Sequence, residues 1–174
     1  GENLDTNIFV FNHGAFKLDG PTKSASAVMP YYTITYNQDP SGENVANAYS
    51  KYIIQDLLYD TYSYEGVVCT DWSITKDYSD VHIHGGKPWG VERLSVDERH
   101  YEVIKAGCDQ FGGNDQKGPV LEAYAMWVAD FGEESARARF EHSAKKLLLN
   151  FFRTGLFENP YLDPAKTAQT VGCS

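Results

Sequence analysis

The chain has 174 residues, which is enough for one domain with a substantial hydrophobic core. Its formal net charge of −9 at pH 7 argues against partners that are nucleic acids or anionic membrane surfaces, because both repel an acidic protein. The sequence has no run of about 18 apolar residues, so we expect no membrane-spanning helix. Neutral carbohydrates meet no such repulsion, and the 12 tyrosines suit sugar binding as well as a large core.

Apolar residues alternate along the chain between short continuous runs, typical of buried strands, and helical periodicity. Ser95 and Glu98 form a capping box, which predicts the start of one of the helices. In chain order we expect a helix over 5–18, a strand over 25–30 (ASAVMP), a helix over 45–59, a strand over 66–70 (GVVCT), a helix over 95–106, a strand over 106–111 (AGCDQF), and helices over 120–130 and 135–153.

Strands that alternate with helices indicate parallel βα units, and nearly continuous apolar strands indicate burial on both faces. A doubly wound sheet and a (β/α) barrel both fit this pattern. A complete barrel needs about 250 residues, so three βα units would be less than half of one. The irregular segment 76–93 follows a strand, and long loops at that position are typical of functional sites.

The sequence predicts no metal site and no cofactor. His82 and His84 have an HxH spacing, but no third ligand is evident. The chain has no CxxC pair, and an odd number of widely spaced cysteines is not a disulfide framework. The cysteines are Cys69, Cys108 and Cys173.

Two further segments have both a functional and a structural interpretation. Lys87, Trp89 and Arg93 either line an outer sugar subsite or pack and cap their loop. The glycine-rich segment 112–118 (GGNDQKG) precedes a helix, so it suits a phosphate site of an unrelated α/β enzyme. It lacks the order of the known phosphate-binding motifs, which favours a plain βα turn.

The sharpest chemical feature is Asp71, which follows the apolar strand GVVCT and precedes Trp72. In βα folds the residues at the carboxyl ends of strands form the active site. A carboxylate there can act as a nucleophile, and a neighbouring tryptophan can stack against a sugar. The alternative is that Asp71 caps a turn while Trp72 fills the core, and the spacing alone leaves both interpretations open.

Four segments in the right order resemble glycoside hydrolase family 3 and together span nearly the whole chain. EGVVCTDWSI (65–74) resembles the nucleophile signature GFVVSDW, and SAVMPYY (26–32) resembles the preceding strand SVMPSY. AGCDQFGG (106–113) resembles the following AGVDLDM-type strand, and FFRTGLFENPYLDP (151–164) resembles the segment KFRLGLFDNPYVDP that ends the barrel domain.

The resemblance implies an α/β fold that is part of a (β/α)8 TIM-type barrel, containing its last three or so βα units. Residues 1–158 would belong to the barrel domain of a longer enzyme, and 159–174 would form a linker toward a second domain. By the same resemblance, Asp71 aligns with the catalytic nucleophile. Trp72, Met29 and Tyr32 align with residues that bind the substrate sugar.

The implied reaction is the hydrolysis of a β-linked oligosaccharide or β-glucoside through a covalent glycosyl intermediate on Asp71. The family's Lys-His motif and its acid/base lie outside the matching region, so we expect the chain alone to be inactive. The alternative is a non-catalytic carbohydrate-binding or assembly module built on the same half barrel. We also expect the rest of the enzyme, or self-association, to cover the open sheet edges. The resemblance suggests a secreted or periplasmic location.

Overall fold

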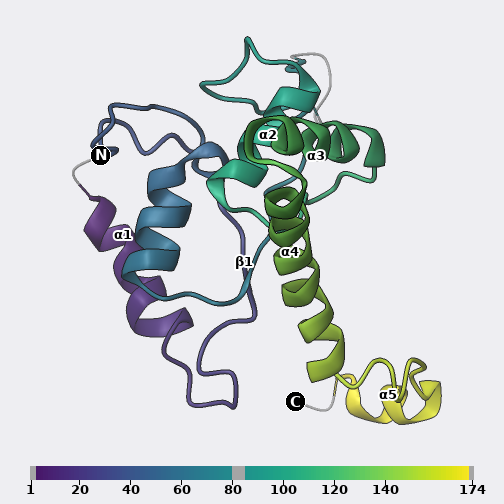
Figure 1. Cartoon of the computed structure of the whole chain (residues 1–174). Helices are drawn as coiled ribbons and strands as arrows, with labels where there is room; N and C mark the ends of the chain where they lie inside the picture. Colours follow the sequence, from purple (N-terminus) through teal and green to yellow (C-terminus); the bar gives the residue numbers. More distant parts are fainter. Residues whose placement is uncertain (1–2, 80–84, 173–174) are drawn as a thin grey trace.

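The computed structural model describes residues 3–79 and 85–172, and it combines short parallel strands with surrounding helices (Figure 1). None of the helices in these two ranges is long and apolar enough to cross a membrane. The elements are α1 (Leu4–Val10), the π-helix η1 (Phe11–Ala15), β1 (Ala27–Val28), the 3-10 helix η2 (Asn47–Tyr49), the π-helix η3 (Tyr52–Thr61), β2 (Val67–Val68), α2 (Val96–Ala106), α3 (Lys117–Phe131), α4 (Glu133–Arg153) and α5 (Pro164–Thr170).

The strands are parallel and follow one another in sequence order. Strand β1 pairs with β2 so that Val28 lies opposite Val68. A third segment continues the sheet through a parallel bridge between Cys69 and Gln110. It is shorter than the expected strand 106–111, because Gly107 ends α2 in a left-handed conformation with φ of 117°. The α/β class predicted from the sequence is confirmed.

The expected helix over 45–59 is divided into η2 and η3. Ser50 separates them with an extended backbone (φ −80°, ψ 110°), and its hydroxyl accepts a hydrogen bond from the Ile53 amide at 3.2 Å. A serine that accepts from an amide three residues ahead acts as an N-cap, so it begins a new helix. The capping box at Ser95 and Glu98 is confirmed, with both of its reciprocal hydrogen bonds present.

The main hydrophobic core lies between the sheet and the helices η3 and α2. Ile54, Val68 and Val103 are almost completely buried there, together with Ile74 from the loop that follows β2. A smaller cluster forms where α2 and α3 pack against each other, around Tyr101 and neighbouring apolar side chains. The core therefore fixes the strand that carries Asp71 and the loop after it.

A buried carboxylate, Asp109, connects helix α4 to the sheet. Its side chain is 1% exposed, and its Oδ2 accepts hydrogen bonds from the Lys146 ammonium at 2.6 Å and from the Val68 amide at 2.9 Å. Its Oδ1 accepts from the Ser143 hydroxyl at 2.6 Å, and the Arg139 guanidinium lies 3.8 Å from the same oxygen. The charge of Asp109 is therefore both paired and hydrogen-bonded, as a buried charge requires.

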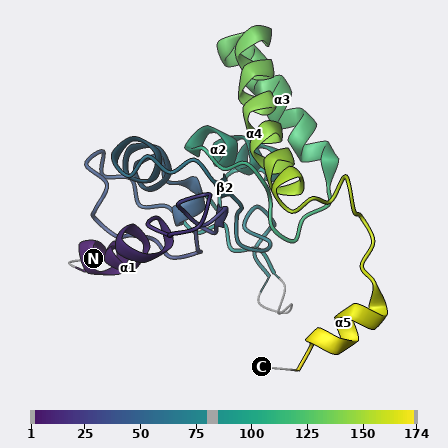
Figure 2. The same cartoon turned by 90° about the horizontal axis from the view of Figure 1, so that it is seen from below.

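The C-terminal segment 159–174, which the resemblance implies is a linker, contains a short helix. It contains α5, because Asp163 accepts hydrogen bonds from the amides of Ala165 and Lys166, and Pro164 occupies the first helical position. Figure 1 shows α4 extending away from α2, and both views show α5 separate from the rest of the molecule (Figures 1 and 2).

Replacing Asp109 with asparagine should lower the free energy of unfolding by about 3 kcal/mol, because Lys146 would stay largely buried without its counter-ion. Urea denaturation of the wild type and the variant measures this. The matched control is Glu141→Gln, which breaks the exposed Arg137–Glu141 pair and should change stability by less than about 0.5 kcal/mol. Equal effects from the two substitutions would contradict the importance of the buried pair.

Candidate active site

Asp71 lies at the carboxyl end of β2, where the sheet continues through a hydrogen bond from the Thr70 amide to the Gln110 carbonyl oxygen at 2.9 Å. The Asp71 residue is 9% exposed, and its Oδ1 accepts a hydrogen bond from the Trp72 amide at 2.6 Å. This edge of a parallel sheet is the usual location of an active site in α/β folds. The carboxylate is therefore held in one orientation, near the surface, by the backbone of the next residue.

Tyr32 reaches the same point from the segment after β1. Its hydroxyl donates a hydrogen bond to the Trp72 carbonyl oxygen at 2.5 Å. Burial, with a smaller contribution from the neighbouring Asp71 carboxylate, raises the pKa of Tyr32 to about 12. Tyr32 thus remains a neutral hydrogen-bond donor beside the carboxylate throughout the ordinary pH range.

A cavity of about 390 Å³ opens beside Tyr32 and Trp72, and Asp71 itself is not among the described residues that line it. The side chain of Trp72, which is 65% exposed, forms one wall. Gly113 packs against the indole so closely that a Cβ atom there would lie 2.6 Å from the ring carbon Cδ2. The described residues that line the cavity are Tyr32, Trp72, Ser73, Lys76, Gly85, Lys87 and Gly113.

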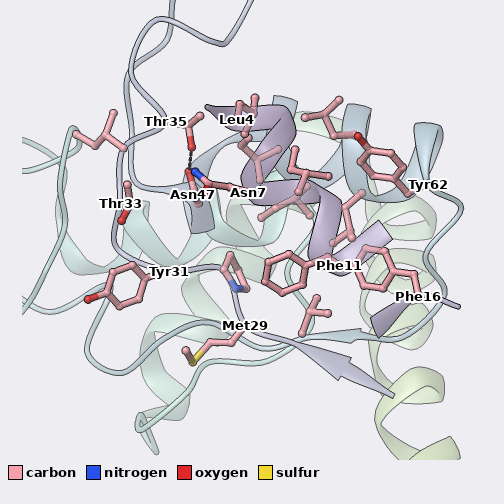
Figure 3. A pocket seen from close by; sticks show the side chains of 18 of the residues that line it. Leu4, Asn7, Phe11, Phe16, Met29, Tyr31, Thr33, Thr35, Asn47 and Tyr62 are labelled. Atoms are coloured by element: carbon pink, nitrogen blue, oxygen red, sulfur yellow. Dashed lines mark hydrogen bonds between the residues drawn. The ribbon is translucent and has the colours of Figure 1, made fainter. Parts of the chain in front are cut away.

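Met29 lies elsewhere, although the sequence groups it with Tyr32 and Trp72. It lines a second cavity of about 540 Å³, between α1, η1, η3 and the segment after β1 (Figure 3). Phe11, Phe16 and Tyr31 line the same space and make it mainly apolar. The structure therefore brings together Asp71, Trp72 and Tyr32, and it places Met29 in a separate cavity.

The loop that follows Asp71 is fixed by a buried arginine that the sequence analysis did not select. Arg99 of α2 is 3% exposed, pairs with Asp77 at 2.7 Å, and donates to the carbonyl oxygens of Thr75, Val91 and Glu92. Helical periodicity gives no sign of this role, because an arginine on a short helix is ordinarily a surface residue.

Of the three residues that the sequence offers for an outer sugar subsite, only one lines the cavity. Lys87 lines the cavity beside Trp72. Trp89 packs against the hydrophobic core and against the ring of Tyr78, and Arg93 is exposed, so these two do not line the cavity. His82 and His84 lie outside the described residues.

His100 connects the same loop to the glycine-rich turn before α3. It is completely buried, and its Nδ1 lies 2.8 Å from the Val96 carbonyl oxygen, which fixes the ring proton on Nδ1. Its Nε2 therefore accepts a hydrogen bond from the Asn114 amide group at 3.1 Å, and the Thr75 hydroxyl lies 3.4 Å away. Burial lowers the pKa of His100 below its ordinary value of 6.5.

Known proteins match the chain over nearly its whole length, although no protein-family model matches it. It is 33% identical over 183 residues to a periplasmic β-glucosidase/β-xylosidase of Dickeya chrysanthemi, and the match covers 98% of this chain and 26% of that protein. It is 36% identical over 173 residues to a probable β-glucosidase C of Aspergillus flavus, with 99% and 25% covered. Along its whole length, the chain is therefore similar to parts of longer β-glucosidases.

Two solved structures have a fold similar to that of this chain. It superposes with a TM-score of 0.61 and 21% identity on a β-glucosidase involved in saponin metabolism from intestinal bacteria, covering 91% of this chain and 17% of that one. It also superposes on a fungal multi-domain family 3 β-N-acetylglucosaminidase with a TM-score of 0.55 and 17% identity. That match covers 85% of this chain and 16% of the other. The chain spans about a quarter of the length of the curated β-glucosidases that it matches.

Replacing Gly113 with alanine should lower the free energy of unfolding by about 1–2 kcal/mol, because Gly113 has a φ of 61° and its new methyl group would displace the Trp72 ring. Thermal melting and the intrinsic tryptophan fluorescence measure the two effects. Gly118→Ala is the matched control, since that glycine lies in α3 with nothing within 4 Å of the new Cβ atom. It should leave the fluorescence unchanged, and a shift in both variants would be against the packing proposed for Gly113.

The free energy of unfolding should fall as the pH drops below about 6.5. In the unfolded chain His100 then binds a proton, whereas in the folded chain its lowered pKa keeps the buried ring neutral. His100 therefore contributes its full stability above pH 6.5 and loses it toward its lowered folded pKa, by at most about 1.4 kcal/mol per pH unit. Urea denaturation at several pH values between 7.5 and 5.5 measures the slope.

The His100→Gln variant should lose most of this slope. His142→Gln is the comparison, because partial burial and the neighbouring Lys146 lower the pKa of that histidine as well. Its removal should leave the part of the slope that is due to His100. An unchanged slope in His100→Gln would show that another group is responsible.

Proposed function

We propose that the chain carries the catalytic nucleophile, Asp71, of a retaining β-glycoside hydrolase of the β-glucosidase or exo-β-glucanase type. One observation carries the proposal: a largely buried carboxylate follows a parallel strand, and the next residue, whose amide donates to that carboxylate, is the exposed tryptophan that lines a cavity. The similarity to β-glucosidases along the whole chain supports a sugar as the occupant of that cavity.

The geometry around Asp71 suits a nucleophile. The hydrogen bond from the Trp72 amide limits the rotation of the carboxylate. In a retaining hydrolase this carboxylate attacks the anomeric carbon, the leaving group departs with a proton from a second carboxyl group, and water then cleaves the glycosyl ester. Trp72 would stack against the sugar. Tyr32 would position the backbone of Trp72, through its hydrogen bond to the Trp72 carbonyl oxygen.

The second carboxyl group would come from another part of the longer enzyme. Asp71 itself precedes the lining residues Trp72 and Ser73, and no other aspartate or glutamate is among the cavity-lining residues that the structure describes. A retaining mechanism needs a second carboxyl group about 5–5.5 Å from the nucleophile. The chain alone should therefore form the glycosyl ester only with a substrate whose leaving group needs no proton.

We further propose that the parallel segments are the last three or so βα units of a (β/α)8 barrel over residues 1–158, with 159–174 as a linker toward a second domain. The consecutive parallel pairing supports the barrel. The end of α4 and the turn after it expose Phe151, Phe152 and Phe157, which supports a covering contact with the rest of the enzyme or with a second copy. The name of the Dickeya relative favours a secreted or periplasmic location.

Covalent trapping tests Asp71 directly. We expect 2-deoxy-2-fluoro-β-glucosyl fluoride to leave a fluoroglucosyl group on the peptide that contains Asp71, because fluoride departs without a general acid. Intact mass and peptide mapping, on this chain and on the longer enzyme, measure the adduct.

Two variants complete the test. Asp71→Asn should abolish the adduct, whereas Asp115→Asn, which removes an exposed carboxylate from the turn before α3, should retain it. An adduct on another peptide of the longer enzyme would refute the role of Asp71. Glucoside binding without any adduct, in both proteins, would favour the non-catalytic carbohydrate-binding module.

A further inference from the structure

Two lysines from different parts of the loop after Asp71 line the same cavity as Trp72 and Tyr32. The amides of Lys76 and Lys87 lie 3.2 and 3.3 Å from the carbonyl oxygen of Ser73 and donate to it, so the backbone holds both residues at one place. The Lys87 ammonium also donates to the Gly85 carbonyl oxygen at 2.8 Å. Both side chains are only partly exposed.

Among the described residues, no acid forms an ion pair with either of these two lysines. Within residues 3–79 and 85–172, no carboxylate oxygen lies within 4.0 Å of either ammonium nitrogen. The buried cations elsewhere are paired, as Arg99 is with Asp77 and Lys146 is with Asp109. Two cations beside one cavity would attract an anion locally, although the chain as a whole has a net charge of −9.

We propose that Lys76 and Lys87 bind a carboxylate on the leaving group of the substrate, so that the site prefers glucosides of acidic aglycones. This inference rests on the proposed function, in which the transferred sugar is glucose. Glucose is uncharged, so an anion bound beside it belongs to the other side of the scissile bond.

The two lysines also answer an electrostatic problem of such a substrate. The Asp71 carboxylate, next in the chain to the lining residue Trp72, would repel a second carboxylate in the cavity and weaken its binding. Two ammonium groups on the cavity wall reverse the local sign of the charge, and they donate hydrogen bonds that a carboxylate accepts. A neutral aglycone would gain nothing from this arrangement.

The experiment compares two substrates of the longer enzyme: the β-glucoside of 4-hydroxybenzoate and that of its methyl ester, which has nearly the same shape but no charge. We expect kcat/KM to be higher for the acid. In the Lys76→Met/Lys87→Met double variant the acid-to-ester ratio of kcat/KM should fall roughly five- to tenfold, the size expected for a partly exposed charge pair. In the wild type, 0.5 M salt should reduce the ratio in the same direction.

Lys166→Met is the matched control, because it removes the same charge from an exposed position on α5 that does not line the cavity. Its ratio should equal that of the wild type. An unchanged ratio in the double variant would overturn the proposal. A lysine-dependent preference for 4-nitrophenyl β-glucuronide over the β-glucoside, without one for the acidic aglycone, would also overturn it.

Binding to the Asp71→Asn variant keeps the inference testable if neither substrate is hydrolysed, an outcome that would count against the proposed function alone. Calorimetry should then show tighter binding of the 4-hydroxybenzoate glucoside than of its ester, and the difference should disappear in the triple variant with Lys76→Met and Lys87→Met. Equal affinities would refute the role of the lysines even if the enzyme were active.

Discussion

The arrangement of the candidate site depends on the buried carboxylate of Asp109. It accepts a hydrogen bond from the Val68 amide, while the amides of Asp109 and Gln110 donate to the Val68 carbonyl oxygen, so one residue of β2 is bound on both of its backbone groups. Lys146 supplies the compensating charge from α4. Because this contact fixes the register of the third strand segment, it also fixes where the following glycines meet the site.

The next residues show how that register reaches the cavity. The Gly112 amide donates to the Thr70 hydroxyl at 3.0 Å, and Gly113 then packs under the indole of Trp72. On the opposite side, Arg99 of α2 binds the loop that continues from Asp71. The site is thus assembled from segments that follow β1, β2 and the third strand segment, and Tyr32 and Gly112 each donate a hydrogen bond to the residues beside Asp71.

Features encoded by neighbouring residues could be predicted from the sequence, and features that join distant residues could not. The capping box at Ser95 and the position of Asp71 after a strand are local signals. Helix α5 has a local signal too, because Asp163 caps it and Pro164 occupies its first position. The partner of Asp109, Lys146, lies 37 residues away, and no periodicity relates them. The placement of Met29 in the larger cavity depends on how α1 and η3 pack, which strand alternation does not determine.

Trp72 is held at three points, and this joins the sugar-binding wall to the proposed nucleophile. Its amide donates to Asp71, its carbonyl oxygen accepts from Tyr32, and its ring lies on Gly113. A rotation of the indole therefore disturbs the peptide groups that orient the carboxylate. A sugar stacked on the ring would restrain those same groups, so binding energy at the wall would also serve to position the attacking oxygen. For that reason a glycine beside the tryptophan matters to the chemistry of the aspartate, although the two never touch.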